Sequence, residues 1–243
     1  CGVHRLWTHR AYKATPALRR LLMTLAIMSF QHNVYKWCRD HRVHHRYADT
    51  DADPQDIRRG FFFAHIGWLV CRKHPAVIRA SRTIDMSDLD HDPLIQFDRR
   101  YHVPLAVVIW GAIPTLIPWY FWSENLWVAL FVCVFYRHAF TLNVTWSLAS
   151  VAHVFGNKPY DKHISGTDCP MEYVMMGESY HNYHHTYPWD YSQCEHGKFV
   201  AFNPGTLFID FFAWLGWAYD LRKPSRENVK NRKLHTGQTI PRY

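Results

Sequence analysis

Two long apolar segments dominate the hydrophobic pattern of the chain. The first, residues 103–122, has 20 residues without a charge, which is the length that a helix needs to cross a bilayer. The second, residues 126–154, is the weaker candidate because Arg137 and His138 interrupt it. Only Ser123, Glu124 and Asn125 separate the two segments, so the pattern predicts a transmembrane helical hairpin. The alternative is a buried hairpin in a large soluble protein, whose core helices usually have shorter apolar runs, of about 10–14 residues.

Three shorter apolar runs remain, residues 21–30, 60–71 and 206–219. They are too short to span a bilayer comfortably, so we expect helices that lie at the membrane face or pack on the soluble part. Residues 223–243 are polar and basic, and we expect a loose tail there.

The charge distribution predicts an orientation for the hairpin. Its turn contains one acid and no base, whereas four basic residues flank the other ends, namely Arg99, Arg100, Lys158 and Lys162. Basic residues favour the cytoplasmic side of a membrane. We therefore expect the residues before 103 and after 154 to face the cytosol.

Composition narrows the class of protein. The 243 residues carry 28 Lys and Arg against 20 Asp and Glu, and 48% of them are hydrophobic. These values exclude a disordered tail, a collagen-like chain and a coiled coil. The six cysteines form no C-x-x-C pair, which is typical of free thiols on the reducing side of a membrane. Because Cys1 stands where Met is expected and a histidine motif starts at His4, we expect further residues upstream in the natural protein.

Histidine is the unusual residue type, with 18 copies. Three clusters stand out: H-R-L-W-T-H-R contains His4 and His9, H-R-V-H-H contains His41, His44 and His45, and H-N-Y-H-H contains His181, His184 and His185. Chance would give only ~0.1 copies of H-x-x-H-H in this composition. On an α-helix, residues i, i+3 and i+4 share a face, so each such motif can direct three imidazoles to one point. Residues five apart lie about 140° around an α-helix, so we expect His4 and His9 to flank a site.

These eight imidazoles exceed the needs of one tetrahedral zinc ion. They suit a pair of metal ions, and imidazole ligation is compatible with Zn, Fe, Cu or Ni. His153, which closes the second apolar segment, is a further candidate. For the other histidines we expect ordinary surface or hydrogen-bonding roles. A histidine-rich dimetal site at a membrane favours oxygen chemistry on a lipid substrate.

The motifs resemble the three histidine boxes of membrane-bound fatty acyl-CoA desaturases, specifically the animal stearoyl-CoA (Δ9) type, including insect members. The boxes are H-R-L-W-T-H-R, D-H-R-V-H-H-R and G-E-S-Y-H-N-Y-H-H, and the likeness extends to R-R-G-F-F-F-A-H-I-G-W-L, R-K-H-P-A-V and G-N-K-P-Y-D. It covers about residues 1–222. Three boxes in this order and at these intervals are highly specific.

The resemblance implies an all-α membrane protein of the endoplasmic reticulum, with residues 1–243 forming a single desaturase domain. The fold would be a four-helix transmembrane bundle with a cytosolic helical cap that holds two iron ions, Fe2+ or Fe3+, and this chain would supply one hairpin. Electrons would pass from NADH through cytochrome b5 reductase and cytochrome b5. With O2, the enzyme would convert a long-chain acyl-CoA into a cis-monounsaturated product. The implied partners are acyl-CoA, the two redox proteins and the lipid membrane, and no nucleic acid.

Carried over position by position, the resemblance implies nine iron ligands, which are His4, His9, His41, His44, His45, His153, His181, His184 and His185. Two positions depart from the family pattern. Ala149 stands where the family has an Asn that reaches one iron through water, and Ser179 stands where the third box usually has Gly. Such outer positions can change metal affinity or activity by about 10–100-fold.

For the substrate, the resemblance implies contacts of the CoA headgroup with Trp37, Arg39, Asp40, Arg72 and Lys73, and of the acyl chain with Trp146. Arg and Lys suit the phosphate charges of CoA. From the residues alone, Arg72 and Lys73 equally suit anionic lipid headgroups, and Trp146 equally suits core or interfacial packing. The family's Asn in F-Q-N-D is His32 here.

Two other functions remain open at this point. A related lipid hydroxylase or alkane monooxygenase would use the same iron chemistry, and a catalytically impaired pseudoenzyme is suggested by Ala149 and Ser179. The R-K-H-P segment and the third box favour desaturation over hydroxylation. Retention of all nine histidines argues against a pseudoenzyme.

Overall fold

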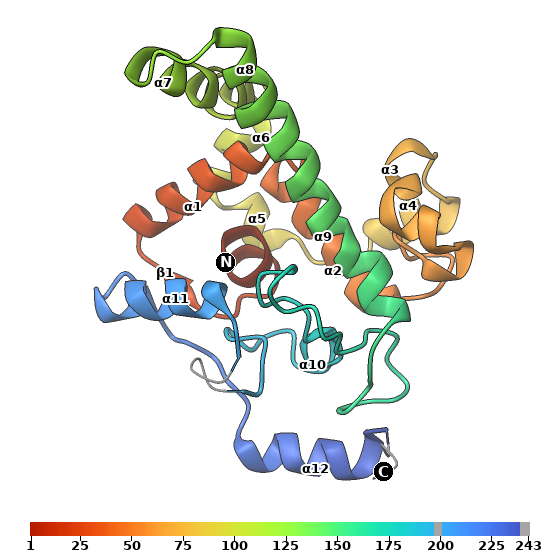
Figure 1. Ribbon diagram of the computed structural model, residues 1–243. Coiled ribbons are helices and arrows are strands. Elements are labelled where there is room, and N and C mark those ends of the chain that lie inside the picture. The colour runs from red at the N-terminus through yellow and green to blue at the C-terminus, as the bar shows by residue number, and fades with distance from the viewer. Residues whose placement is uncertain (197–200, 239–243) are drawn as a thin grey trace.

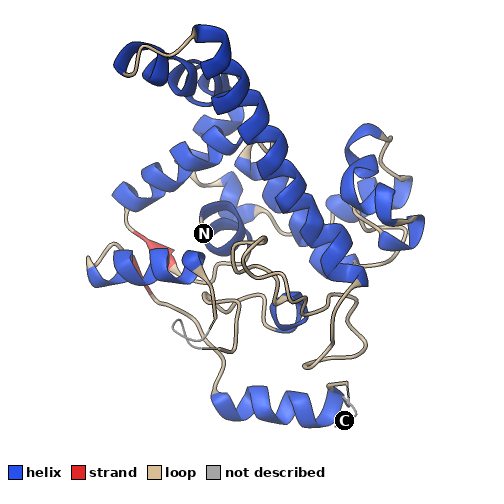
Figure 2. Ribbon diagram, viewed as in Figure 1, coloured by secondary structure: helices blue, strands red, loops and turns tan. Residues whose placement is uncertain are grey.

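The structure is a computed structural model that describes residues 1–196 and 201–238. It is mostly helical, as predicted, with long loops around the third histidine box (Figures 1 and 2). The described residues contain one small antiparallel strand pair, in which Lys13 pairs with Tyr219 and Ala14 with Ala218. These strands are β1 (Lys13–Ala14) and β2 (Ala218–Tyr219).

Two helical segments form the hairpin at one end of the molecule (Figure 1). They run over Pro93–Phe121 and Leu126–Val154, and both are long and apolar enough to cross a membrane. Only 17% and 11% of their most apolar windows are buried, which favours contact with lipid over the core of a soluble protein. The pieces are α6 (Pro93–Ala106), η4 (Val107–Ala112), α7 (Ile113–Phe121), α8 (Leu126–Leu130), η5 (Phe131–Tyr136) and α9 (Arg137–Val154), where η4 and η5 are π-helical.

Local sequence sets the ends of these helices. The first begins at Pro93, upstream of the predicted start at 103, because Asp92 caps it and proline suits the first helical turn. At the turn, the side chain of Asn125 accepts hydrogen bonds from the backbone N–H groups of Trp127 (2.9 Å) and Val128 (3.3 Å). The polar residues that break the apolar pattern therefore also start the second helix.

Arg137, which weakened the prediction of the second span, compensates for a proline in the first. Pro114 has no N–H to donate to the carbonyl of Trp110, four residues earlier. The Nη2 of Arg137 donates to that carbonyl at 3.3 Å, and its Nη1 donates to the carbonyl of Met28 at 3.2 Å. Arg137 thus connects both hairpin helices to the end of another helix, α1 (Pro16–Ser29).

Helices α1 (Pro16–Ser29) and α2 (Val34–Tyr47) pack beside the base of the hairpin, next to the π-helix η1 (Gly2–Thr8). Their apolar faces share one core with α6 and α11 (Pro204–Trp214), formed among others by Leu18, Leu22, Cys38, Ile95 and Ile209. An ion pair between Arg19 and Asp92 connects α1 to the start of α6. This core fixes the first and second histidine boxes against each other.

Most of the remaining elements are short. They are the 3-10 helix η2 (Ile57–Arg59), the π-helix η3 (Phe63–Gly67), α3 (Trp68–Val70), α4 (Pro75–Ser81), α5 (Ser87–Asp90) and α10 (His181–Thr186). In α10 lie the histidines of the third box.

The expectation of a loose tail after residue 222 is wrong for the part of it that the structure describes. Residues Arg226–Thr236 form helix α12, capped by the side chain of Ser225. Two ion pairs anchor the helix, Arg232 with Asp161 and Lys233 with Glu195. Both acidic partners lie outside residues 223–243, so the sequence of the tail alone does not reveal them. Residues 239–243 lie outside the described residues.

Candidate metal centre

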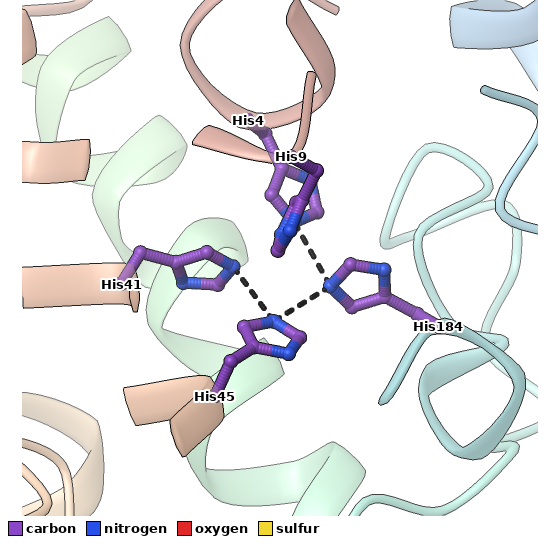
Figure 3. A group of neighbouring side chains, drawn as sticks. All are labelled: His4, His9, His41, His45 and His184. Carbon is purple, nitrogen blue, oxygen red and sulfur yellow. Dashed lines mark hydrogen bonds between the residues drawn. The ribbon is translucent and has the colours of Figure 1, made fainter. Parts of the chain in front are cut away.

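The nine predicted histidines gather in two neighbouring groups at the end of α9 that is remote from the hairpin turn. Within each group, one ligand-type nitrogen from every residue lies within 4.8 Å of the others. Figure 3 shows the first group, in which rings from η1, α2 and α10 point toward one another. We call the two sets group A, which is His4, His9, His41, His45 and His184, and group B, which is His44, His153, His181 and His185.

Helical geometry explains how α2 and α10 serve both groups. In each H-x-x-H-H motif the residues at i and i+4 join the same group, which unites His41 with His45 and His181 with His185. The residue at i+3, His44 or His184, belongs to the opposite group. The expectation that each motif directs three imidazoles to one point is therefore wrong, because the i+3 ring is rotated far enough to reach the neighbouring point.

The first box departs from α-helical geometry. The segment Gly2–Thr8 is a π-helix, and the backbone N–H of His9 donates to the carbonyl of His4 at 3.2 Å. In a π-helix, residues five apart lie nearly above one another. The rings of His4 and His9 are accordingly side by side, with centroids 4.9 Å apart, instead of flanking the site as expected.

The spacing of the nitrogens fits metal coordination. In group A, the Nε2 of His184 lies 3.1 Å from that of His4 and 2.9 Å from that of His45 (Figure 3). In group B, the Nε2 of His181 lies 3.0 Å from those of His153 and His185. Ligands bound at about 2.0–2.1 Å and at right angles are about 3.0 Å apart, whereas tetrahedral ligands are about 3.4 Å apart. These closest spacings are therefore compatible with nitrogens that share one ion.

Two further properties suit a cation. Among the described residues, the buried Nε2 of His9 has no hydrogen-bond partner, so this nitrogen is available as a metal ligand. Burial is the main cause that lowers the pKa of most of the imidazoles well below the usual histidine value, which keeps them neutral, as metal binding requires. These are His9, His41, His45, His181, His184 and His185.

Two carboxylates that the sequence analysis missed contact the outer nitrogens of the groups. Nδ1 of His44 donates to Asp53 at 2.9 Å, and Nδ1 of His4 lies 3.3 Å from Glu178, which also pairs with Arg5. Burial alone would lower the pKa of His44, but Asp53 raises it overall. Burial would likewise raise the pKa of Glu178, but Arg5 and His4 hold it well below its usual value. The one feature of the sequence that could have indicated these carboxylates is that both acids lie close to a histidine box.

Comparison with known proteins identifies the family. The sequence model of the family "Fatty acid desaturase" matches residues 1–200. Stearoyl-CoA desaturase 5 of Bos taurus is 50% identical over 97% of this chain and 70% of its own length. The chain belongs to the fatty acid desaturase family. The human stearoyl-CoA desaturase 5 is 47% identical over 98% of this chain and 72% of its length, and the acyl-CoA Delta(11) desaturase of Choristoneura rosaceana is 46% identical over 97% and 70%.

The desaturase brings three of the predicted headgroup residues together. Asp40 accepts hydrogen bonds from Arg39 at 3.0 Å and from Lys73 at 2.5 Å, although Lys73 comes from the segment before α4. Arg72 is exposed beside Lys73 in sequence. Trp37 is also on α2, and its ring lies 4.8 Å from that of His41 and 5.9 Å from that of His4. It therefore borders group A.

The other predicted positions of the desaturase lie along α9 and the third box. Trp146 is half-buried, with its ring 5.9 Å from that of His65. His65 bonds to Ser150 at 2.9 Å, which is the ordinary hydrogen-bonding role expected for histidines outside the boxes. Ala149 and Ser179 are buried, and among the described residues the Ser179 hydroxyl has no hydrogen-bond partner.

Proposed function

We propose that this chain carries the catalytic site of an oxygen-dependent acyl-CoA desaturase that introduces a cis double bond into a long-chain saturated acyl-CoA. The observation that carries the proposal is the pair of histidine groups beside an apolar cavity, at the base of a membrane-capable hairpin. In the reaction, one C–H bond breaks on each of two adjacent carbons and a C=C bond forms. With two added electrons and two protons, O2 is reduced to two molecules of water.

Nine neutral or hydrogen-bonded imidazoles would hold the metal pair, with group A around one ion and group B around the other. Iron bound there would supply the activation of O2. The protein's own contribution is positional, since the rings come from η1, α2, α9 and α10, and the shared core holds the first two of these elements together. Burial around the rings also keeps bulk water from the reacting carbon atoms.

The acyl chain would occupy the cavity that ends at group A. This cavity has a volume of about 460 Å³. Its walls include Leu22, Leu25 and Phe208, which give it an apolar lining, and His4 and Trp37 at the metal side. An acyl chain in this position would bring its methylene groups next to His4, as dehydrogenation requires.

The CoA headgroup would bind the basic cluster of Arg39, Arg72 and Lys73. Asp40 holds the first and last of these side chains in place, so their positive charges are fixed before the phosphates arrive. Preorganised cations lose less conformational entropy on binding than free side chains do. Trp37 would contact the chain where it reaches the metals. Trp146 is not among the residues that line this cavity, so its proposed contact with the acyl chain rests on the family resemblance alone.

Loss of Lys73 should weaken substrate binding more than chemistry. In the full-length protein, Lys73→Ala should raise KM for stearoyl-CoA about tenfold and leave kcat nearly unchanged, because the lost charge-assisted hydrogen bond is remote from the metals. Initial rates over a range of acyl-CoA concentrations give both constants. Lys230→Ala, which removes an exposed lysine of α12, is the control. A fall in kcat with KM unchanged would contradict the assignment.

The membrane context follows from the hairpin. Arg99, Arg100, Lys158 and Lys162 lie toward the end that carries the histidine groups, whereas the turn has one acid. We therefore infer a multi-pass protein of the endoplasmic reticulum, half of whose four-helix bundle is this hairpin, with the metal centre facing the cytosol. The two electrons would come from NADH through cytochrome b5 reductase and cytochrome b5.

Ala149 offers a test of the local geometry around group B. It lies four residues, or about one helical turn, before His153 on α9. Ala149→Asn should preserve or raise turnover of the full-length protein, because asparagine at this position can reach a metal through a water molecule. Turnover per bound iron is the measurement. A large loss would show that the surroundings of His153 no longer accept the amide.

The proposal is tested by reconstitution. Purified full-length protein with stearoyl-CoA, NADH, cytochrome b5, its reductase and O2 should yield a monounsaturated acyl-CoA and none without O2. A hydroxylated product would instead indicate a monooxygenase. No product from protein that contains two iron ions would contradict the proposed function and indicate a pseudoenzyme.

A further inference from the structure

Among the described residues, each histidine group has one carboxylate within 3.3 Å of an outer ring nitrogen. A second acid near group B, Asp49, lies farther away, at 3.9 Å from Nδ1 of His153. In group B the carboxylate is Asp53, whose side chain has no exposed surface and accepts the Nδ1 hydrogen of His44 at 2.9 Å. Its oxygens also accept backbone N–H groups of Asp49 at 2.9 Å and Gln55 at 2.8 Å. The carboxylate is therefore held in one orientation, and its charge is directed at His44.

In group A the carboxylate is Glu178, which interacts with two cationic or donor groups, His4 and Arg5. Its Oε2 lies 3.3 Å from Nδ1 of His4, whereas its Oε1 accepts a shorter bond of 2.7 Å from the buried guanidinium of Arg5. Its side chain retains 20% exposure. Compared with Asp53, Glu178 makes a longer contact with its histidine, is more hydrated and is partly neutralised.

These contacts fix which ring nitrogen faces the metal. A carboxylate only accepts hydrogen bonds, so the proton of each neutral imidazole must sit on Nδ1 and leave the Nε2 electron pair free. The same contact stops rotation of the ring and increases its basicity. Loss of the carboxylate would permit the other tautomer, which presents N–H to the ion.

We propose that Asp53 and Glu178 are positioning residues that each control retention of one metal ion, Asp53 for group B and Glu178 for group A, with Asp53 having the larger effect. The inference rests on the proposed metal pair. It deepens that proposal by assigning the ions separate determinants of binding. An outer-shell carboxylate of this kind typically changes metal affinity by about 10–100-fold.

The experiment is metal release from the full-length protein in detergent. Iron-loaded wild-type protein is mixed with a chromogenic Fe2+ chelator, and the number of ions and their release rates are recorded. Asp53→Asn preserves the shape of the side chain and should accelerate release of one of the two ions by about 10–100-fold while the other keeps its wild-type rate. Glu178→Gln should accelerate release of the other ion by a smaller factor. The double variant should accelerate release of both ions.

A matched control separates positioning from general destabilisation. Asp56 is as buried as Asp53 but pairs with Arg58, and it has no hydrogen bond or ion pair with a histidine in the part of the chain that the structure describes. Asp56→Asn should retain both wild-type release rates. If Asp53→Asn does not fold, Glu178→Gln still tests the inference through its single accelerated ion. Wild-type release rates in both variants, or equal acceleration of both ions by one variant, would overturn it. Wild-type protein that holds fewer than two ions would instead contradict the proposed function.

Discussion

Desaturation should be abolished when His184 is replaced by alanine in the full-length protein. The Nε2 of His184 lies between those of His4 and His45, at 3.1 and 2.9 Å, so one residue of α10 completes the group formed by η1 and α2 (Figure 3). Without it, group A loses its only ring from the third box. We expect activity below about 0.1% of wild type, because the metal site supplies the reactive chemistry. Product formation from stearoyl-CoA and iron content per chain are the measurements.

His163→Ala is the control for this variant, since His163 is exposed and belongs to neither group. It should retain wild-type activity and iron content. Sustained turnover by His184→Ala, at an expression level equal to that of the control, would refute the role of His184 as a ligand.

The second large effect concerns stability. Arg5 is fully buried and donates to Glu178, Asn203, Thr206 and the carbonyl of Tyr191, at 2.7 to 3.2 Å. It thus connects the first histidine box to the third and to the start of α11. Arg5→Met would leave the carboxylate of Glu178 without its cation, and removal of one partner from a buried ion pair typically costs about 3–5 kcal/mol. We expect a large fall in the thermal unfolding temperature of the purified full-length protein.

Arg10→Met provides the comparison in the same segment. Arg10 is half exposed and its ion pair with Asp88 lies at the surface, where such pairs contribute about 0–1 kcal/mol. The unfolding temperature of the Arg10→Met variant should stay close to that of the wild type. Equal unfolding temperatures for Arg5→Met and Arg10→Met would show that the buried network contributes little.

The sequence was most informative where the signal is local. The polar turn at residues 123–125 and the apolar pattern predicted the hairpin, and residue spacing singled out eight of the nine histidines that the structure brings together. The ninth, His153, was a candidate because it closes the second apolar segment. The offset of the i+3 ring is local, but which rings share a group depends on how η1, α2, α9 and α10 come together in the tertiary structure. The pairing of His4 with His9 was also missed, since it requires a π-helix and the motif was interpreted with α-helical geometry.

The remaining differences arise from long-range contacts. Arg137 looked unfavourable in an apolar segment, but it donates to the carbonyl of Trp110 on the other hairpin helix, which cannot accept a hydrogen bond from Pro114. The contacts of Asp53 with His44 and of Glu178 with His4 are formed by the folded chain, so the sequence did not indicate them. Helix α12 likewise depends on acidic partners at positions 161 and 195. Each of these features is a contact between two segments of the chain that only the tertiary structure brings together.

The most direct test of the account is complementation in a yeast strain that lacks its own Δ9 desaturase. The full-length gene is expressed, and the cellular fatty acids are profiled by mass spectrometry with derivatisation of double bonds. The account predicts new monounsaturated acyl chains, and the same spectra locate the double bond. Hydroxylated chains, or no new product from a membrane-inserted protein that contains iron, would contradict it.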